Sequence, residues 1–329
     1  MTGPDTRTSL PPFLESLAPD FSVPYINACF PASEGIPPVH VHWWPCKRLG
    51  VSPSTVLFFI PGNPGVINFY HPFLTAIHKQ DRSGTLAILS HSHIGHDPAI
   101  EDLSLASRVS SNHALLFQVQ NSLRIFDALS IYFGINTRTV ITGHSVGSWV
   151  ALQVLKLRSV AVSGVFFLFP TITNIACTPN GRLFSRFFQP PFPRIVSQVA
   201  RALRLMPLTI FCWLFPQYPI LQARVLQSFL LSPSSIFAAM TMAHDEMLSI
   251  RELDVTTLET YRHQIWFYFA ENDDWVDKGR EMILQVFGPE PDTVKVVHGH
   301  RDIPHAFCIS HGEELAAECY EWLVSGGFV

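Results

Sequence analysis

Uninterrupted runs of apolar residues recur along the chain, and each ends in a turn or a loop. Short runs rich in β-branched and aromatic residues are typical of strands that are buried on both faces of a parallel sheet. They occupy residues 54–60, 85–89, 139–142, 164–169 and 264–270, and residues 293–298 form a further predicted strand that is interrupted by Lys295. A weaker alternation of apolar and polar residues between positions 21 and 44 predicts one or two antiparallel strands at the edge of the same sheet.

Segments with an apolar residue at every third or fourth position lie between these runs, and this spacing predicts helices that bury one face. They occupy residues 69–80, 111–133, 148–158, 277–286 and 312–324. Buried strands that alternate with helices predict an α/β fold, with a mostly parallel sheet and helices on both faces. Residues 1–20 are rich in proline, serine and threonine, and we expect them to form a disordered tail.

A long segment interrupts the alternation after residues 164–169, the sixth predicted strand. We therefore expect residues 21–170 and 262–329 to form the core, and residues 171–261 to form an inserted, hydrophobic helical cap. Within this cap, residues 205–223 carry no charged side chain. That length would allow a membrane span. However, three prolines interrupt any such helix, namely Pro207, Pro216 and Pro219.

Two interpretations fit the middle of the cap. The favoured one is an interfacial or re-entrant hairpin that docks on a membrane, with arginines at headgroup level on either side, Arg194, Arg201 and Arg204 before it and Arg224 after it. The inserted tip would then consist of Phe211, Trp213, Leu214 and Phe215. The alternative is a lid whose apolar face packs on the active site. Different helices of one cap could serve both purposes.

Composition and charge support a lipid surface as partner. Hydrophobic residues make up 47% of the chain and charged residues 15%, and the mean hydropathy is +0.22. The net charge of -4 gives no nucleic-acid footprint. Residues 128–244 contain no Asp or Glu, although they contain both Lys and Arg. A basic, apolar middle in an acidic chain predicts a surface that meets anionic headgroups.

The cysteines indicate the compartment. The six cysteines are scattered, with no C-x-x-C pair, and the N-terminus has acidic residues but no cationic and then apolar signal segment. We therefore expect a protein that faces the cytosol and has reduced thiols.

The sequence Gly143-His144-Ser145-Val146-Gly147 follows one apolar run and precedes a predicted helix. This is the G-x-S-x-G nucleophile elbow in the strand–turn–helix context that it requires. The serine hydroxyl projects from a sharp turn, and glycine on either side of it leaves room for the neighbouring strand and helix. The motif predicts Ser145 as a nucleophile.

A serine hydroxyl is a weak nucleophile at neutral pH and needs a base, which in turn needs an orienting acid. In proteins with this elbow the acid and then the histidine follow late strands. Asp273 is the favoured acid in the loop after residues 264–270, and Asp274 is its rival. His305 is the favoured base in the loop after residues 293–298, and His300 is the alternative.

Two backbone N–H groups should stabilise the oxyanion of an acyl-transfer intermediate. Val146, at a helix N-terminus directly after the nucleophile, should supply one of them. The other should come from the turn Pro61-Gly62-Asn63-Pro64-Gly65. Proline has no N–H, so Asn63 is the expected donor and Gly62 the alternative.

The histidines of the loop His91-Ser92-His93-Ile94-Gly95-His96-Asp97 raise the question of a metal. No fourth ligand other than Asp97 lies at a suitable spacing, and the serine chemistry above requires no metal or other cofactor. We expect these histidines to form a polar rim at the mouth of the site.

Several of these segments together resemble the lipid droplet-associated hydrolase family. They are the P-G-N-P-G turn with Phe69-Tyr70 and Pro72-Phe73 after it, the loop 93–96, the elbow, Asp273 with Trp275 two residues later, and Ile303-Pro304-His305-Ala306-Phe307. The likeness extends over nearly all of the chain from about Phe21. It implies the α/β-hydrolase fold and a Ser145, Asp273 and His305 triad. It also implies location on lipid droplets and the cytosolic face of the endoplasmic reticulum.

The first hypothesis is therefore a serine esterase that acts on acyl esters of neutral lipids, sterol esters or acylglycerols, at a droplet surface. A second is a droplet-binding or organising protein with little turnover. A third is a thioesterase or acyltransferase, which shares the nucleophile and differs only in the leaving group or acceptor.

Overall fold

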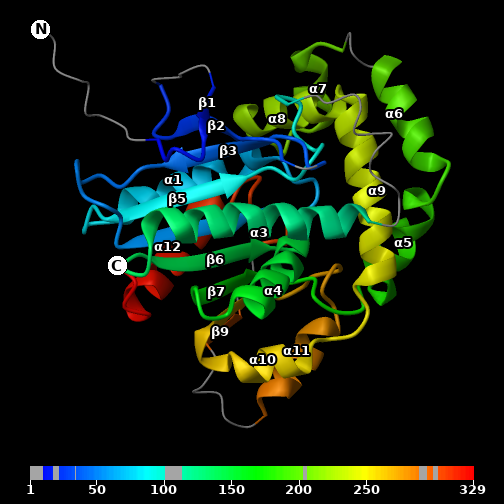
Figure 1. Ribbon diagram of the computed structural model, residues 1–329. Helices are drawn as coiled ribbons and strands as arrows, with labels where there is room; N and C mark the ends of the chain where they lie inside the picture. The colour runs from blue at the N-terminus through cyan, green and yellow to red at the C-terminus, as the bar shows by residue number, and fades with distance from the viewer. Residues whose placement is uncertain are drawn as a thin grey trace, which may run out of the picture.

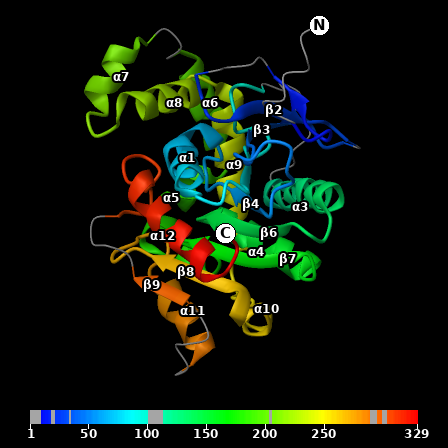
Figure 2. The same ribbon diagram turned by 90° about the vertical axis from the view of Figure 1, so that its left-hand side faces the viewer.

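The computed structural model of the chain describes residues 10–17, 22–33, 35–100, 113–202, 206–288, 295–298 and 303–329. Its centre is a nine-stranded sheet in the order β1-β2-β3-β5-β4-β6-β7-β8-β9 (Figures 1 and 2). The strands are β1 (Glu15–Ser16), β2 (Ile26–Phe30), β3 (Val39–Trp44), β4 (Thr55–Ile60), β5 (Leu86–His91), β6 (Arg138–His144), β7 (Val162–Leu168), β8 (Ile265–Phe269) and β9 (Lys295–His298).

The sheet is antiparallel at one edge and parallel elsewhere. β1, β2, β3 and β5 pair antiparallel in turn. β5, β4, β6, β7, β8 and β9 pair parallel. β4 and β5 are buried at every residue, as expected of strands that are covered on both faces. The predicted α/β fold with antiparallel edge strands is confirmed.

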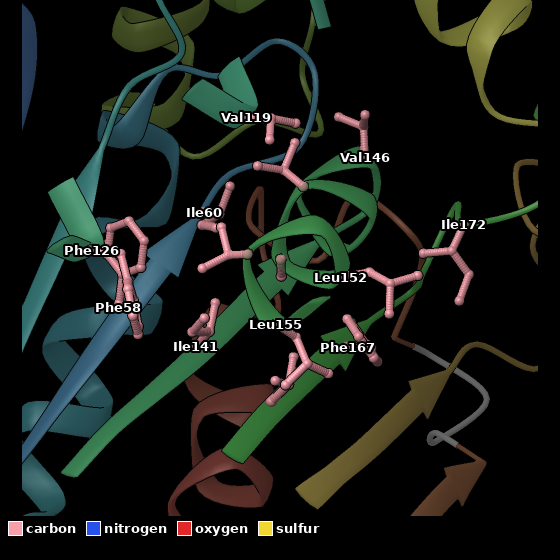
Figure 3. Packing of buried hydrophobic residues seen from close by; sticks show 14 of the residues in the cluster. Phe58, Ile60, Val119, Phe126, Ile141, Val146, Leu152, Leu155, Phe167 and Ile172 are labelled. Carbon is pink, nitrogen blue, oxygen red and sulfur yellow. The ribbon is translucent and has the colours of Figure 1, made fainter. Parts of the chain in front are cut away.

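Helices cover both faces of the sheet, and the pleat assigns alternate strand residues to each of them. The helices of the core are α1 (His71–Gln80), α3 (Ala114–Phe133), α4 (Val146–Arg158), α11 (Gly279–Phe287) and α12 (Gly312–Ser325). Phe58 and Ile60 belong to the apolar cluster that contains α3 and α4 residues (Figure 3). Leu57 and Phe59 belong to the cluster that contains α1 and α12 residues. The sheet therefore lies between two packed apolar layers, one on each of its faces.

The inserted cap is helical and lies between β7 and β8. It consists of a 3-10 turn (Ile175–Cys177), α5 (Pro179–Phe188), α6 (Phe192–Ala202), α7 (Leu208–Leu214), α8 (Ile220–Leu230), α9 (Pro233–Ser249) and α10 (Val255–Thr260). α9 contacts α3, α5, α6 and α8, while α10 lies beside α11 (Figure 1). β7 corresponds to the sixth predicted strand. It is the seventh strand of the structure because the two-residue β1 precedes the predicted strands.

The expected disordered tail is wrong for residues 10–17. Glu15 and Ser16 pair with Cys29 and Ala28 of β2, and Leu14 is buried in the core. Leu14, the partly buried Leu10 and Phe13 and one short strand pairing thus hold a segment whose composition is typical of disorder. Residues 1–9 lie outside the described part of the chain.

None of the described helices is both long and apolar enough to cross a membrane alone. α8 and α9 pass that test only as a pair, and they are bent by 88° at the break between them.

Candidate active site

Ser145 lies at the turn between β6 and α4 and has φ 54° and ψ -122°. A non-glycine residue at positive φ costs about 1–3 kcal/mol and persists only where the surroundings enforce it. Here the backbone N–H of Ser145 donates to Leu168 O at 2.9 Å. The turn holds the serine at the carboxyl ends of the central parallel strands.

Backbone atoms crowd the two glycines of the elbow. A Cβ on Gly143 would collide with the carbonyl group of Gly147, and a Cβ on Gly147 would collide with the carbonyl oxygens of Ile60 and Pro61. These are close approaches between main-chain segments, which cannot move aside as the end of a side chain can. The sharp turn therefore requires glycine at both positions.

The structure brings Ser145, His305 and Asp273 into one hydrogen-bonded chain. His305 Nε2 lies 2.9 Å from Ser145 Oγ, and His305 Nδ1 lies 2.8 Å from Asp273 Oδ2. A carboxylate only accepts hydrogen bonds, so Nδ1 carries a proton and donates a hydrogen bond to Asp273. Nε2 is then free to accept the Ser145 hydroxyl proton.

The same contacts distinguish Asp273 from its rival Asp274. Asp273 is also fixed by its own loop, because the backbone N–H groups of Trp275 and Val276 donate to Oδ1 at 2.9 and 3.2 Å. The adjacent Asp274 is exposed, and its backbone oxygen accepts from the Asn180 N–H. The alternative base, His300, lies outside the described residues.

The turn after β4 lies against the nucleophile. A Cβ on Gly62 would come within 3.1 Å of Ser145 Cβ. The Gly62 N–H donates to Tyr70 Oη at 3.0 Å, so it is already occupied. Among the expected donors from this turn, that leaves the Asn63 N–H. Val146 is the first residue of α4, where a backbone N–H has no partner within the helix.

His144 joins Tyr70, the partner of Gly62 in the P-G-N-P-G turn, to the loop that carries His305, and sequence reasoning missed these contacts. Its Nε2 lies 2.9 Å from the backbone oxygen of His305, and its Nδ1 lies 2.8 Å from Tyr70 Oη. A carbonyl only accepts, so Nε2 donates and Nδ1 accepts from the Tyr70 hydroxyl. Burial and the neighbouring His305 lower the pKa of His144 well below its usual value. The ring therefore stays neutral and keeps this tautomer.

The three histidines at the end of β5 and in the loop after it do not form the expected polar rim at the mouth of the site. His91, His93 and His96 are buried, and His91 is the last residue of β5. The His96 ring accepts from the Gly65 N–H at 3.0 Å, while His93 packs where a Cβ on Gly65 would lie. His93 and His96 thus pack against the P-G-N-P-G turn at Gly65.

Burial lowers the pKa of His91 to about 4 and that of His96 to about 3. Within the described part of the chain, no group of three or more His, Cys, Asp or Glu side chains is arranged to hold a metal ion.

A cavity of about 490 Å³ opens at Ser145 and His305. Core and cap contribute to its largely apolar wall, which includes Phe69, Phe188, Val196, Leu226, Phe229, Ile236, Met240, Met247 and Ile309. α5, α6, α8 and α9 all supply lining residues. The cap therefore covers Ser145 as a lid does, and the space beneath it is an apolar cavity of the size that binds small ligands.

One acidic residue of the cap also lines this cavity. Glu246 of α9 is buried and accepts a hydrogen bond from Asn63 Nδ2 at 2.7 Å. The pKa of Glu246 is raised to about 8, mainly by burial; the hydrogen bond from Asn63 opposes this rise, and the adjacent Asp245 contributes to it. Sequence reasoning gave no reason to single out this residue.

The proposed docking tip is only partly exposed. Trp213 and Leu214 are 77% and 48% exposed, but Phe211 is 3% exposed, and its ring stacks on Phe215, with centroids 6.2 Å apart. The prediction that Phe211 inserts into a membrane is therefore wrong, because it packs inside the cap. Other large apolar side chains are exposed on the cap helices, namely Leu183, Phe187, Ile195, Val199, Ile210, Ile220 and Leu221.

Comparisons with known proteins indicate the family of the chain. Residues 53–308 match a family model described as Lipid-droplet associated hydrolase. The chain is 28% identical over 278 residues to the lipid droplet-associated hydrolase of Pongo abelii, covering 80% of this chain and 83% of that protein. It is 25% identical over 292 residues to that of Drosophila melanogaster, covering 85% and 92%.

Among solved structures, a peroxisomal alpha-beta-hydrolase from Saccharomyces cerevisiae aligns with a TM-score of 0.58 at 14% identity. The alignment covers 95% of this chain and 88% of that one. Similarity at this level shows the α/β-hydrolase fold, which the strand order of the sheet also indicates.

Proposed function

Because this chain belongs to the lipid droplet-associated hydrolase family, a group of hydrolases with the α/β-hydrolase fold, we propose that it is a serine esterase acting on neutral lipids at the droplet surface. The observation that carries this proposal is the chain of contacts Ser145–His305–Asp273 at the mouth of an apolar cavity. The acyl group of the substrate would occupy that cavity.

The proposed reaction proceeds through an acyl-enzyme. His305 Nε2 takes the proton of Ser145 as Oγ attacks the ester carbonyl, and Asp273 stabilises the imidazolium that results. The N–H groups of Val146 and Asn63 hold the negative oxygen of the tetrahedral intermediate. His305 then gives its proton to the departing alcohol, and water repeats the sequence to release the fatty acid.

The cap supplies the contact with the lipid surface in this proposal. Trp213 and Leu214 on α7 would insert among the acyl chains, while the exposed Arg182, Arg186, Arg194 and Arg224 would lie at headgroup level. Since other cap helices line the cavity, docking would place the entrance of the site next to its substrate. The endoplasmic reticulum, at its cytosolic face, is proposed as a second location on the same grounds.

Hydrolysis on artificial droplets tests this proposal. Purified wild-type protein and Ser145→Ala would be incubated with phospholipid-coated droplets that contain acylglycerols or sterol esters, and released fatty acid would be measured. We expect release from the wild type and a fall of at least about 10³-fold in Ser145→Ala. If the wild type binds the droplets but releases no fatty acid from any ester, the protein is a droplet-binding protein and the proposal is refuted.

A further inference from the structure

Several polar groups of the cavity wall already have hydrogen-bond partners within the protein. The Ser145 and His305 side chains form the triad contact, and both ring nitrogens of His144 are hydrogen-bonded, one to Tyr70 Oη and the other to the backbone oxygen of His305. The Asn63 amide nitrogen donates to Ala239 O and Glu246 Oε1, at 3.0 and 2.7 Å. These groups are therefore already in use.

Glu246 is different, because only one of its two oxygens is used. Oε1 accepts from Asn63, but Oε2 has no hydrogen-bond partner among the described residues. Glu246 as a whole is 4% exposed and lines the cavity. A polar atom left without a partner at a buried site is costly, and a ligand group that pairs with it recovers that cost.

Its position relates this oxygen to the reacting ester. Glu246 contacts the side chain of Asn63, and the backbone N–H of Asn63 is the proposed oxyanion donor. The adjacent Gly62 lies against Ser145. A substrate group that reaches Oε2 therefore belongs to the part of the molecule near the ester, and not to the far end of an acyl chain.

A hydroxyl group suits this position best. It accepts a hydrogen bond from a neutral carboxyl group and donates one to an ionised carboxylate, so it pairs with Glu246 in either protonation state. An ester carbonyl pairs only with the neutral form, and a sterol ring or an alkyl chain does not pair at all.

We propose that Glu246 binds a free hydroxyl group of the substrate alcohol, so that the site selects fatty acid esters of polyols that keep a free hydroxyl. Partial acylglycerols have this chemistry. Sterol esters and fully esterified glycerol lack it. The inference rests on the proposed function, since it assigns the alcohol part of the ester to one wall of the same site.

Calorimetric binding of a matched pair of ethers tests this selection without any turnover. The first ligand is 1-O-octylglycerol, and the second is octyl propyl ether, which has the same chain and the same ether oxygen but lacks both hydroxyl groups. We expect the wild type to bind the first about 10- to 100-fold more tightly, as one hydrogen bond to a buried polar group allows. Glu246→Gln should retain much of this preference, because the amide can accept from Asn63 and still bond to a hydroxyl.

Glu246→Leu and Glu246→Met should bind the two ligands within about threefold of each other. The matched control Glu252→Leu changes an exposed glutamate outside the cavity wall and should keep the wild-type preference. Equal affinity of the wild type for both ligands, no binding of either, or a preference that survives in Glu246→Leu or Glu246→Met would each overturn the inference. A retained preference in a protein that hydrolyses no ester would instead refute the proposed function alone.

Discussion

At the scale of single residues, two adjacent aspartates with the same chemistry have different environments. Asp273 contacts both His305 and the backbone of its own loop, while Asp274 is exposed. We predict that Asp273→Asn lowers kcat by about 10³- to 10⁴-fold, because an amide at this position no longer holds the imidazole in the required tautomer. Asp274→Asn should change kcat less than about twofold. Steady-state kinetics on a soluble ester would compare the two, and a larger loss in Asp274→Asn would reject the assignment of the acid.

His144 is predicted to act through position alone. Replacing it with Phe removes the hydrogen bonds to Tyr70 Oη and to the backbone of His305, so the base and the P-G-N-P-G turn lose their common support. Small displacements at a reacting centre are costly, and we expect kcat to fall about 10- to 100-fold while KM changes little. Tyr70→Phe breaks only one of these bonds and should have the smaller effect. Unchanged kcat in His144→Phe, with the triad serine still labelled, would contradict this role.

The three residues of the hydrogen-bonded chain could be predicted from the nucleophile motif and the order of elements. The contacts that support them could not. Ser145, Asp273 and His305 follow from the order of elements in this fold, and the structure brings all three together. Glu246 contacts Asn63 across 183 positions of the chain, and no local pattern marks such a pair. His144 lies inside the motif itself, but its partners come from two other segments.

At the scale of elements, uninterrupted apolar runs located the buried strands, because a strand that is buried on both faces has apolar residues at successive positions. The apolar pattern located the cap as a unit but not the orientation of its helices. α7 is apolar along its whole length, so its sequence alone cannot show that Phe211 faces inward and Trp213 outward. The two-residue β1 is too short to leave any periodic signal.

The exposed side of α7 gives a prediction at this scale. The double variant Trp213→Glu/Leu214→Glu replaces two exposed apolar side chains, each of which would contribute about 1.5–3 kcal/mol if it were buried in lipid. We expect binding to phospholipid-coated droplets, measured by flotation, to fall by at least about tenfold. Esterase activity on a soluble substrate should be kept.

The matched control for that experiment is Ile131→Glu/Ile135→Glu, which changes two strongly exposed isoleucines (83% and 98%) at the end of α3 and in the loop after it. It should leave flotation unchanged. Equal losses in the two double variants, or none in the α7 variant, would exclude α7 as the docking element.

At the scale of the whole molecule, buried titratable groups predict how stability depends on pH. Burial lowers the pKa of His71, His91 and His96 to about 3, 4 and 3, so the unfolded chain binds more protons below its histidine pKa near 6.5. Stability therefore falls as the pH drops through that value. Glu246, with its pKa raised to about 8, binds its proton more tightly in the folded state, and its contribution falls as the pH rises from about 4.5 to 8.

Three histidines outweigh one glutamate in acid, so we expect maximum stability between about pH 6.5 and 7. The loss from there to about pH 8.5 should be of the order of 2 kcal/mol. Thermal unfolding measured across this range would show the maximum. Glu246→Gln should flatten the alkaline side of the curve and leave the acid side unchanged; a Tm that keeps rising above pH 8 in the wild type would contradict the assignment.

The central claim is that Ser145 is an activated nucleophile, and labelling with a fluorophosphonate probe tests it most directly. After reaction of the wild-type protein, peptide mass spectrometry should find the phosphonate on Ser145, and Ser145→Ala should show no labelling. His305→Ala should react far more slowly, because the serine has lost its base. A folded wild-type protein that does not react, or a label that persists in Ser145→Ala, would contradict the account.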